Sequence, residues 1–162
     1  MPLTNKNYLP GIQSNPAKLQ AAFVKIRALD QQNMRIEHLA VWTNQLDALK
    51  AFYERFFDAR SNEKYCNPKK QFSSYFLSFA GGARLELMQM PGIDAGNNDI
   101  MQQHTGLIHF AMSTGSKEAV DALTERIRQA GFAVIGEPRW TGDGYYESVV
   151  LDPDNNRIEI TI

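Results

Sequence analysis

The amino-acid sequence contains the same pattern twice, and this internal repeat limits the possible folds more than any other feature. An apolar run that carries a histidine, residues 36–41 (IEHLAV), recurs around His109 at an offset of 71 (109 − 38). A run that carries a glutamate, residues 84–87 (RLEL), recurs around Glu159 at an offset of 73 (159 − 86). One short loop insertion accounts for the difference between the two offsets. The chain is therefore predicted to contain two copies of one structural unit.

Each unit reads as a strand, a helix and three further strands. In the first unit, alternation and helical spacing predict a strand at 36–43, a helix at 46–57, and strands near 60–65, 73–79 and 84–90. In the second unit they predict a strand at 107–113, a helix at 116–130, and strands near 133–140, 145–151 and 157–162. The pattern is βαβββ twice, which belongs to the α+β class.

The repeats leave an extension at the N-terminus. Residues 1–33 precede them, and the spacing of the apolar side chains at 19, 23, 26 and 29 predicts one amphipathic helix there. This apolar stripe needs a surface to cover, either on the main domain or on a second subunit. We therefore expect an extension at 1–33 and one domain at 34–162, made of the repeats 34–92 and 105–162.

Composition and charge narrow the range of partners. The 17 basic and 18 acidic residues leave a net charge of −1, so no basic surplus points to nucleic acid or to an anionic membrane. No apolar run approaches the roughly 20 residues that span a bilayer, and the N-terminus lacks the pattern of a secretory signal. Cys66 is the single cysteine, so neither an internal disulfide nor a thiolate-rich zinc site is expected. These features predict a cytoplasmic protein that acts on a small molecule.

The repeated histidines and glutamates are the candidate functional residues. Strand alternation turns the neighbouring aliphatic side chains toward the helices and places His38, Glu86, His109 and Glu159 on the opposite face. Facing carboxylates away from water are costly, and a divalent cation removes that cost. A single histidine or glutamate in a strand is more often structural, but matched recurrence in two repeats favours metal binding. Two imidazoles and two carboxylates suit zinc, nickel or cobalt, and iron or manganese is also compatible.

These motifs resemble the vicinal oxygen chelate superfamily, and within it the glyoxalase branch. The resemblance rests on residues 37–41, 84–87, 106–110 and 152–159 and covers about 34–162. It implies the glyoxalase/bleomycin resistance fold, in which two βαβββ modules form a curved mixed sheet around a metal site. It also implies a substrate bound through two adjacent oxygens. Whether the modules pair within one chain or across a homodimer stays open at this point.

The order His, Glu, His, Glu resembles that of glyoxalase I. Related ring-cleaving dioxygenases with non-haem iron need no carboxylate at Glu86, and metal-free bleomycin-sequestering relatives lack the ligand set. Both remain alternative functions. Glutathione-using glyoxalase I commonly has an arginine and an asparagine where this chain has Trp42 and Met90. These departures argue against glutathione as the thiol.

The function expected from the resemblance is that of a metal-dependent lyase or isomerase on a small α-oxo or thiohemiacetal-type substrate, similar to lactoylglutathione lyase. One divalent metal per site would be held by His38, Glu86, His109 and Glu159. Glu159 is the stronger candidate for the catalytic base and Glu86 the second. Weaker candidates for substrate contacts are Trp42, Arg84, Trp140, Tyr145 and Arg157.

Overall fold

The computed structural model describes residues 16–17, 20, 34–96 and 99–162. The chain divides into two compact units, Met1–Arg35 and Ile36–Ile162. The helical stripe predicted at 19–29 lies outside the described residues. Within the described parts of the chain, no helix is both long and apolar enough to cross a bilayer. The account below concerns the second unit.

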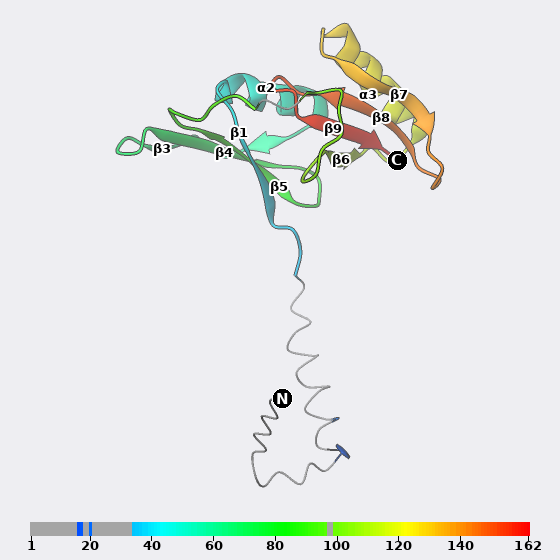
Figure 1. Ribbon diagram of the computed structural model, residues 1–162, viewed down its shortest axis with the longest axis horizontal. Helices are drawn as coiled ribbons and strands as arrows, with labels where there is room; N and C mark the ends of the chain where they lie inside the picture. Colours follow the sequence, from blue (N-terminus) through cyan, green and yellow to red (C-terminus); the bar gives the residue numbers. More distant parts are fainter. Residues whose placement is uncertain (1–15, 18–19, 21–33, 97–98) are drawn as a thin grey trace, which may run out of the picture. The chain divides into compact units, whose positions relative to one another are not determined.

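The first module contains one helix and a mixed sheet (Figure 1). Its elements are β1 (His38–Trp42), α2 (Leu46–Phe57), β2 (Arg60–Ser61), β3 (Tyr65–Asn67), β4 (Phe72–Ser78) and β5 (Arg84–Gln89). The strand order is β1-β5-β4-β2, with β3 also paired to β4. β1 runs parallel to β5, and the other pairs are antiparallel. Helix α2 connects β1 to β2 at the opposite edge of the sheet. The following strands lead back across the sheet, so that the last strand, β5, lies beside β1.

The second module repeats this arrangement. Its elements are β6 (Phe110–Ser113), α3 (Lys117–Gln129), β7 (Val134–Trp140), β8 (Tyr146–Leu151) and β9 (Arg157–Thr161). The strand order is β6-β9-β8-β7, and β6 runs parallel to β9. The predicted α+β fold with two βαβββ modules is confirmed.

One predicted strand differs from its counterpart in the other module. The strand expected near 60–65 is divided into β2 and β3. Between them, Asn62 pairs with Phe76 of β4 by a backbone bond, and its side-chain oxygen also accepts the backbone N–H of Phe76. A side chain that takes a place in the hydrogen-bond ladder displaces the backbone, which interrupts the regular strand.

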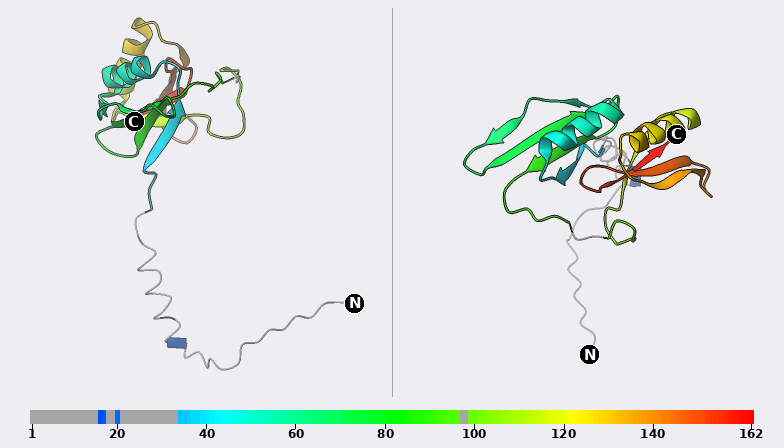
Figure 2. Two further views of the ribbon diagram at one scale, coloured as in Figure 1. Left: turned by 90° about the vertical axis from the view of Figure 1, so that its left-hand side faces the viewer. Right: turned by 90° about the horizontal axis from the view of Figure 1, so that it is seen from above.

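The helices cover the same side of both sheets and lie side by side (Figure 2). Leu49 and Tyr53 of α2, and Val120 and Ile127 of α3, are fully buried against the strands. Amphipathic spacing explains this, because apolar residues three and four apart share one helix face. The strand side chains of opposite parity, including those of Glu86 and Glu159, therefore face away from the helices.

Contacts between the modules fix their placement within the unit. The rings of Phe52 and Phe132 meet edge to face at 4.8 Å. The Tyr53 hydroxyl of the first module donates to Oδ2 of the buried Asp152 in the β8–β9 turn at 2.8 Å. Gln45 Nε2 donates to Asp154 Oδ1 of the same turn at 2.7 Å. The buried Tyr53–Asp152 bond joins this turn to α2, and Asp152 Oδ2 also accepts from Asn156 Nδ2 within the turn.

Replacing Tyr53 by phenylalanine is expected to lower the free energy of unfolding by about 1–3 kcal/mol. The substitution keeps the ring and removes one donor from Asp152, whose pKa is already raised by burial. Tyr75→Phe is the matched control, because its hydroxyl bonds the exposed Asp47 and water can replace it. Urea denaturation measures both, and an equal cost for the two variants would contradict the structural role of the Tyr53–Asp152 bond.

Candidate metal centre

The first His–Glu pair lies on two neighbouring parallel strands. His38 begins β1, and Ala40, two residues further along, lies opposite Glu86 of β5. The side chains of His38 and Glu86 are therefore diagonal neighbours on one face of the sheet. His38 Nε2 lies 3.9 Å from Glu86 Oε2. The His38 side chain is 40% exposed and that of Glu86 16%. We call this pair half-site 1.

The second pair reproduces the first. His109 directly precedes β6, and Ala111 of β6 lies opposite Glu159 of β9. His109 Nε2 lies 3.4 Å from Glu159 Oε2, and the two side chains are 43% and 18% exposed. We call this pair half-site 2. The sequence repeat therefore places the same His–Glu pair in each module. In both pairs the glutamate side chain is less exposed to solvent than the histidine side chain.

The two half-sites do not meet within the described residues of one chain. No three or more His, Cys, Asp or Glu side chains in that part of the chain lie close enough to share an ion. Each half-site nevertheless fits a divalent metal by its donors. Bonds of about 2.0–2.2 Å place neighbouring ligands of a four-coordinate ion about 3–3.5 Å apart, close to the two observed separations. One half-site supplies half of a four-ligand set.

Glu37 lies beside half-site 1, and the strand pattern did not single it out. Its Oε2 lies 2.6 Å from His38 Nδ1, and its Oε1 accepts a hydrogen bond from Arg84 Nε and forms an ion pair with Arg84 Nη2. The hydrogen bond with His38 is the main cause that lowers the pKa of Glu37, and Arg84 adds to it. Phe76 meets the His38 ring edge to face at 5.4 Å. The sequence feature that could have identified Glu37 is its position directly before His38, a candidate metal ligand.

Glu147 is a residue beside half-site 2 that the sequence pattern did not single out. Its side chain is only 13% exposed and pairs with Arg139 Nη2 at 3.2 Å. Burial raises the pKa of Glu159, and the nearby Glu147 carboxylate raises it further. A residue of β8 therefore adds a second carboxylate next to Glu159.

Three of the sequence-predicted residues line one cleft of about 550 Å³. Trp42, His109 and Arg157 come together there with the apolar side chains of Ile100 and Leu107. Arg157 donates from Nη2 to the carbonyl oxygens of Ile100 and Gln102, at 2.6 and 2.9 Å. These two hydrogen bonds join Arg157, which lines the cleft with His109, to the segment that connects the two modules.

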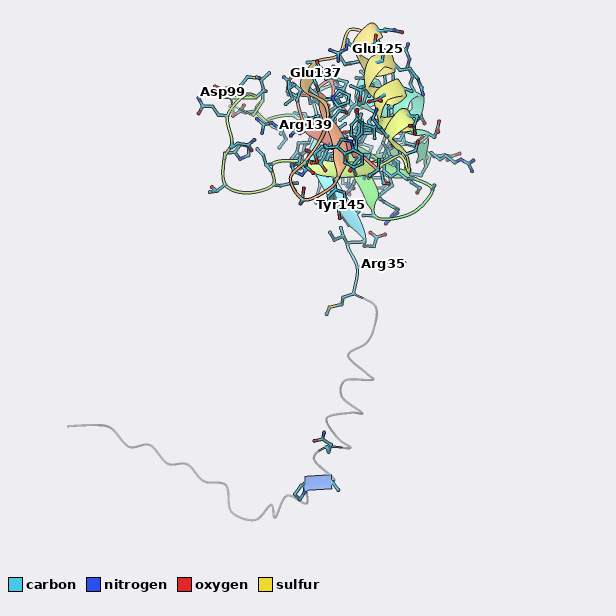
Figure 3. The ribbon with its side chains drawn as sticks, turned by 90° about the vertical axis from the view of Figure 1, so that its right-hand side faces the viewer. Arg35, Asp99, Glu125, Glu137, Arg139 and Tyr145 are labelled. Atoms are coloured by element: carbon cyan, nitrogen blue, oxygen red, sulfur yellow. The ribbon has the colours of Figure 1, made fainter. Side chains whose placement is uncertain are left out.

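The other predicted substrate contacts lie elsewhere. Arg84 is engaged with Glu37, as described above. Trp140 is exposed and packs on Tyr146 at 5.2 Å, on the side of the sheet where Tyr146 bonds Asp121 of α3. Tyr145 is exposed beside the β7–β8 turn (Figure 3). Neither aromatic residue is among those that line the cleft.

A sequence profile of the glyoxalase/bleomycin resistance protein/dioxygenase superfamily matches residues 35–160. The chain belongs to this superfamily. The match spans both modules, and membership of this superfamily accounts for the repeated fold. No curated protein matches the chain in sequence.

Solved structures of the same superfamily share the fold. A glyoxylase/bleomycin resistance protein/dioxygenase domain from Frankia sp. EAN1pec has 21% identity and a TM-score of 0.67 over 80% of this chain and 97% of that one. A glyoxalase I variant from Zea mays has 24% identity and a TM-score of 0.68 over 86% of this chain. This chain spans only about half of the maize protein, 48%. The trypanothione-dependent glyoxalase I of Leishmania major has 21% identity and a TM-score of 0.63, over 80% of this chain and 86% of that one.

Proposed function

We propose that this chain is a metal-dependent lyase or isomerase of the glyoxalase I type. Its substrate would be a small α-oxo compound or a thiohemiacetal, and its reaction the transfer of a proton between adjacent carbons. The observation that carries the proposal is the duplicated His–Glu pair, which lies on the open face of each sheet with nearly the same geometry. The superfamily contains glyoxalase I, which supports this reading of the pair.

We further propose that two copies of the chain complete each site. A catalytic metal site uses three or more protein ligands, whereas each half-site offers two. The junction at Tyr53 and Asp152 holds the two modules of one chain side by side, and the histidines of both half-sites remain open to solvent. In a two-fold homodimer, half-site 1 of each copy would face half-site 2 of the other, which gives two equal sites.

A divalent ion bound by His38, Glu86, His109 and Glu159 would polarise two adjacent substrate oxygens and acidify the neighbouring C–H bond. Glu159 would accept that proton on a carboxylate oxygen and return it to the adjacent carbon. In the metal-free chain, partial burial and the nearby Glu147 carboxylate raise the pKa of Glu159. Glu86 is the second candidate for the same step.

The cleft beside half-site 2 supports a small substrate with an apolar part. Trp42, Ile100 and Leu107 offer apolar surface to such a substrate. Arg157, which donates to carbonyl oxygens there, and three aspartates (94, 99 and 154) are the charged residues of the same cleft. Trp42 and Met90 replace the polar residues that the glutathione-using enzymes commonly have, so a thiol other than glutathione is proposed.

Elemental analysis of the purified protein, together with turnover of the methylglyoxal adduct of a small thiol, tests this function. We expect about one zinc, nickel or cobalt ion per chain and isomerisation of the adduct. His109→Ala should lose the metal, whereas His104→Ala, which removes a histidine outside the proposed ligand set, should retain it. Iron with oxygen consumption would favour a dioxygenase instead. No metal after reconstitution would contradict the function and favour a ligand-sequestering protein.

A further inference from the structure

We propose that Glu37 is a positioning residue for His38, which it holds in one tautomer and one orientation, and that Arg84 in turn fixes Glu37. The inference rests on the proposed function, because it concerns a ligand of the proposed metal site. It assigns Arg84 to this support rather than to the substrate.

The hydrogen bonds determine which nitrogen of His38 is left for a metal. An ionised carboxylate can only accept, so the 2.6 Å contact requires that Nδ1 carry the proton and donate it to Glu37 Oε2. Nε2 then keeps its lone pair and is the nitrogen that faces Glu86, at 3.9 Å. Metal-binding histidines generally donate their other N–H to such an acceptor, which also raises the basicity of the ligand nitrogen.

Glu37 is itself held at several points. Arg84 Nε donates to Oε1 at 2.8 Å, and Arg84 Nη2 forms an ion pair with the same oxygen at 2.6 Å. The Arg84 backbone N–H also donates to the Glu37 carbonyl oxygen at 2.9 Å. The guanidinium lies over Phe76 at 4.2 Å, and Phe76 contacts the His38 ring. Glu37 and Phe76 therefore both contact the His38 ring, and Arg84 contacts both of them.

Fold stability alone does not explain this arrangement. The Glu37 and Arg84 side chains are both about half exposed, and exposed ion pairs contribute little to folding. Half-site 2 has no copy of it: Ile108 stands at the repeat position of Glu37, and Val149 at that of Phe76. An apolar side chain cannot accept a hydrogen bond from His109. This support is thus specific to His38.

Two measurements test the role of Glu37. Long-range ¹H–¹⁵N NMR of the metal-free protein, at a pH where the imidazole is neutral, should show His38 protonated at Nδ1. In Glu37→Ala this signature should shift toward a mixture of tautomers, while that of His109 stays unchanged. Competition with a chelator should show zinc affinity reduced about 10–100-fold in Glu37→Ala. Glu37→Gln, which keeps an acceptor oxygen without the charge, should lie between Glu37→Ala and the wild type.

Glu63→Ala is the matched control, since it removes another exposed glutamate, outside both half-sites. It should leave the tautomer and the zinc affinity unchanged. An Nε2-protonated His38 in the wild type, or an unchanged tautomer and zinc affinity in Glu37→Ala, would overturn the inference. If the wild type bound no zinc, the proposed function would fail, and the NMR signature alone would then decide the role of Glu37.

Discussion

Glu159→Gln is expected to lower kcat by about 10²–10⁴-fold, which is the usual contribution of a positioned general base. Glutamine keeps a carbonyl oxygen that can remain a ligand, but it cannot take up the proton. Steady-state turnover of the methylglyoxal–thiol adduct measures the loss. Metal content is determined on the same sample, so that loss of the base is separated from loss of the ion.

Glu86→Gln is the matched variant, because it makes the same change at the equivalent place in the first module. We expect a smaller loss of kcat there, since the surroundings of the two glutamates differ. Glu159 has the Glu147 carboxylate beside it, whereas Ser74 occupies the repeat position of Glu147 (147 − 73) next to Glu86. An equal or larger loss of kcat in Glu86→Gln would contradict the assignment of Glu159 as the base.

The sequence was sufficient for the features that depend on local periodicity and on the repeat. Helix α2 begins and ends where apolar spacing predicted, at Leu46 and Phe57. The first and last strands of each module, which carry the matched His and Glu runs, are neighbours. Amphipathic patterns carry this information because they record which face of an element is buried.

Glu37 was missed for a physical reason. Strand alternation would direct it to the face opposite His38. However, β1 begins only at His38, so Glu37 is free of that rule and its side chain turns back to the ring. Glu147 was missed for another reason. In the sequence, Arg139 and Glu147 have the pattern of an ordinary cross-strand ion pair on a hairpin. The burial of Glu147 depends on the whole sheet and cannot be predicted from this local pattern.

Residues at equivalent positions of the two repeats can also have different hydrogen-bond and ion-pair partners. Arg84 and Arg157 both stand two residues before a candidate metal ligand, yet Arg84 binds Glu37 and Arg157 binds carbonyl oxygens of the inter-module connection. The partners of Arg157 lie in the connection between the repeats, and Glu37 has no acidic counterpart in the second repeat, where Ile108 stands. Local patterns also could not decide whether the modules pair within one chain or between chains.

The central claim is that each site combines half-site 1 of one copy with half-site 2 of another. A mixed dimer tests it most directly: His38→Ala and Glu159→Ala chains with different tags are co-expressed, and the dimer carrying both tags is purified. Each parent homodimer should lack metal and activity. The mixed dimer retains one complete ligand set, from half-site 1 of the Glu159→Ala chain and half-site 2 of the His38→Ala chain. We predict one metal ion per mixed dimer and about half of the wild-type turnover, whereas a mixed dimer without metal or activity, or no dimer at all, would contradict the claim.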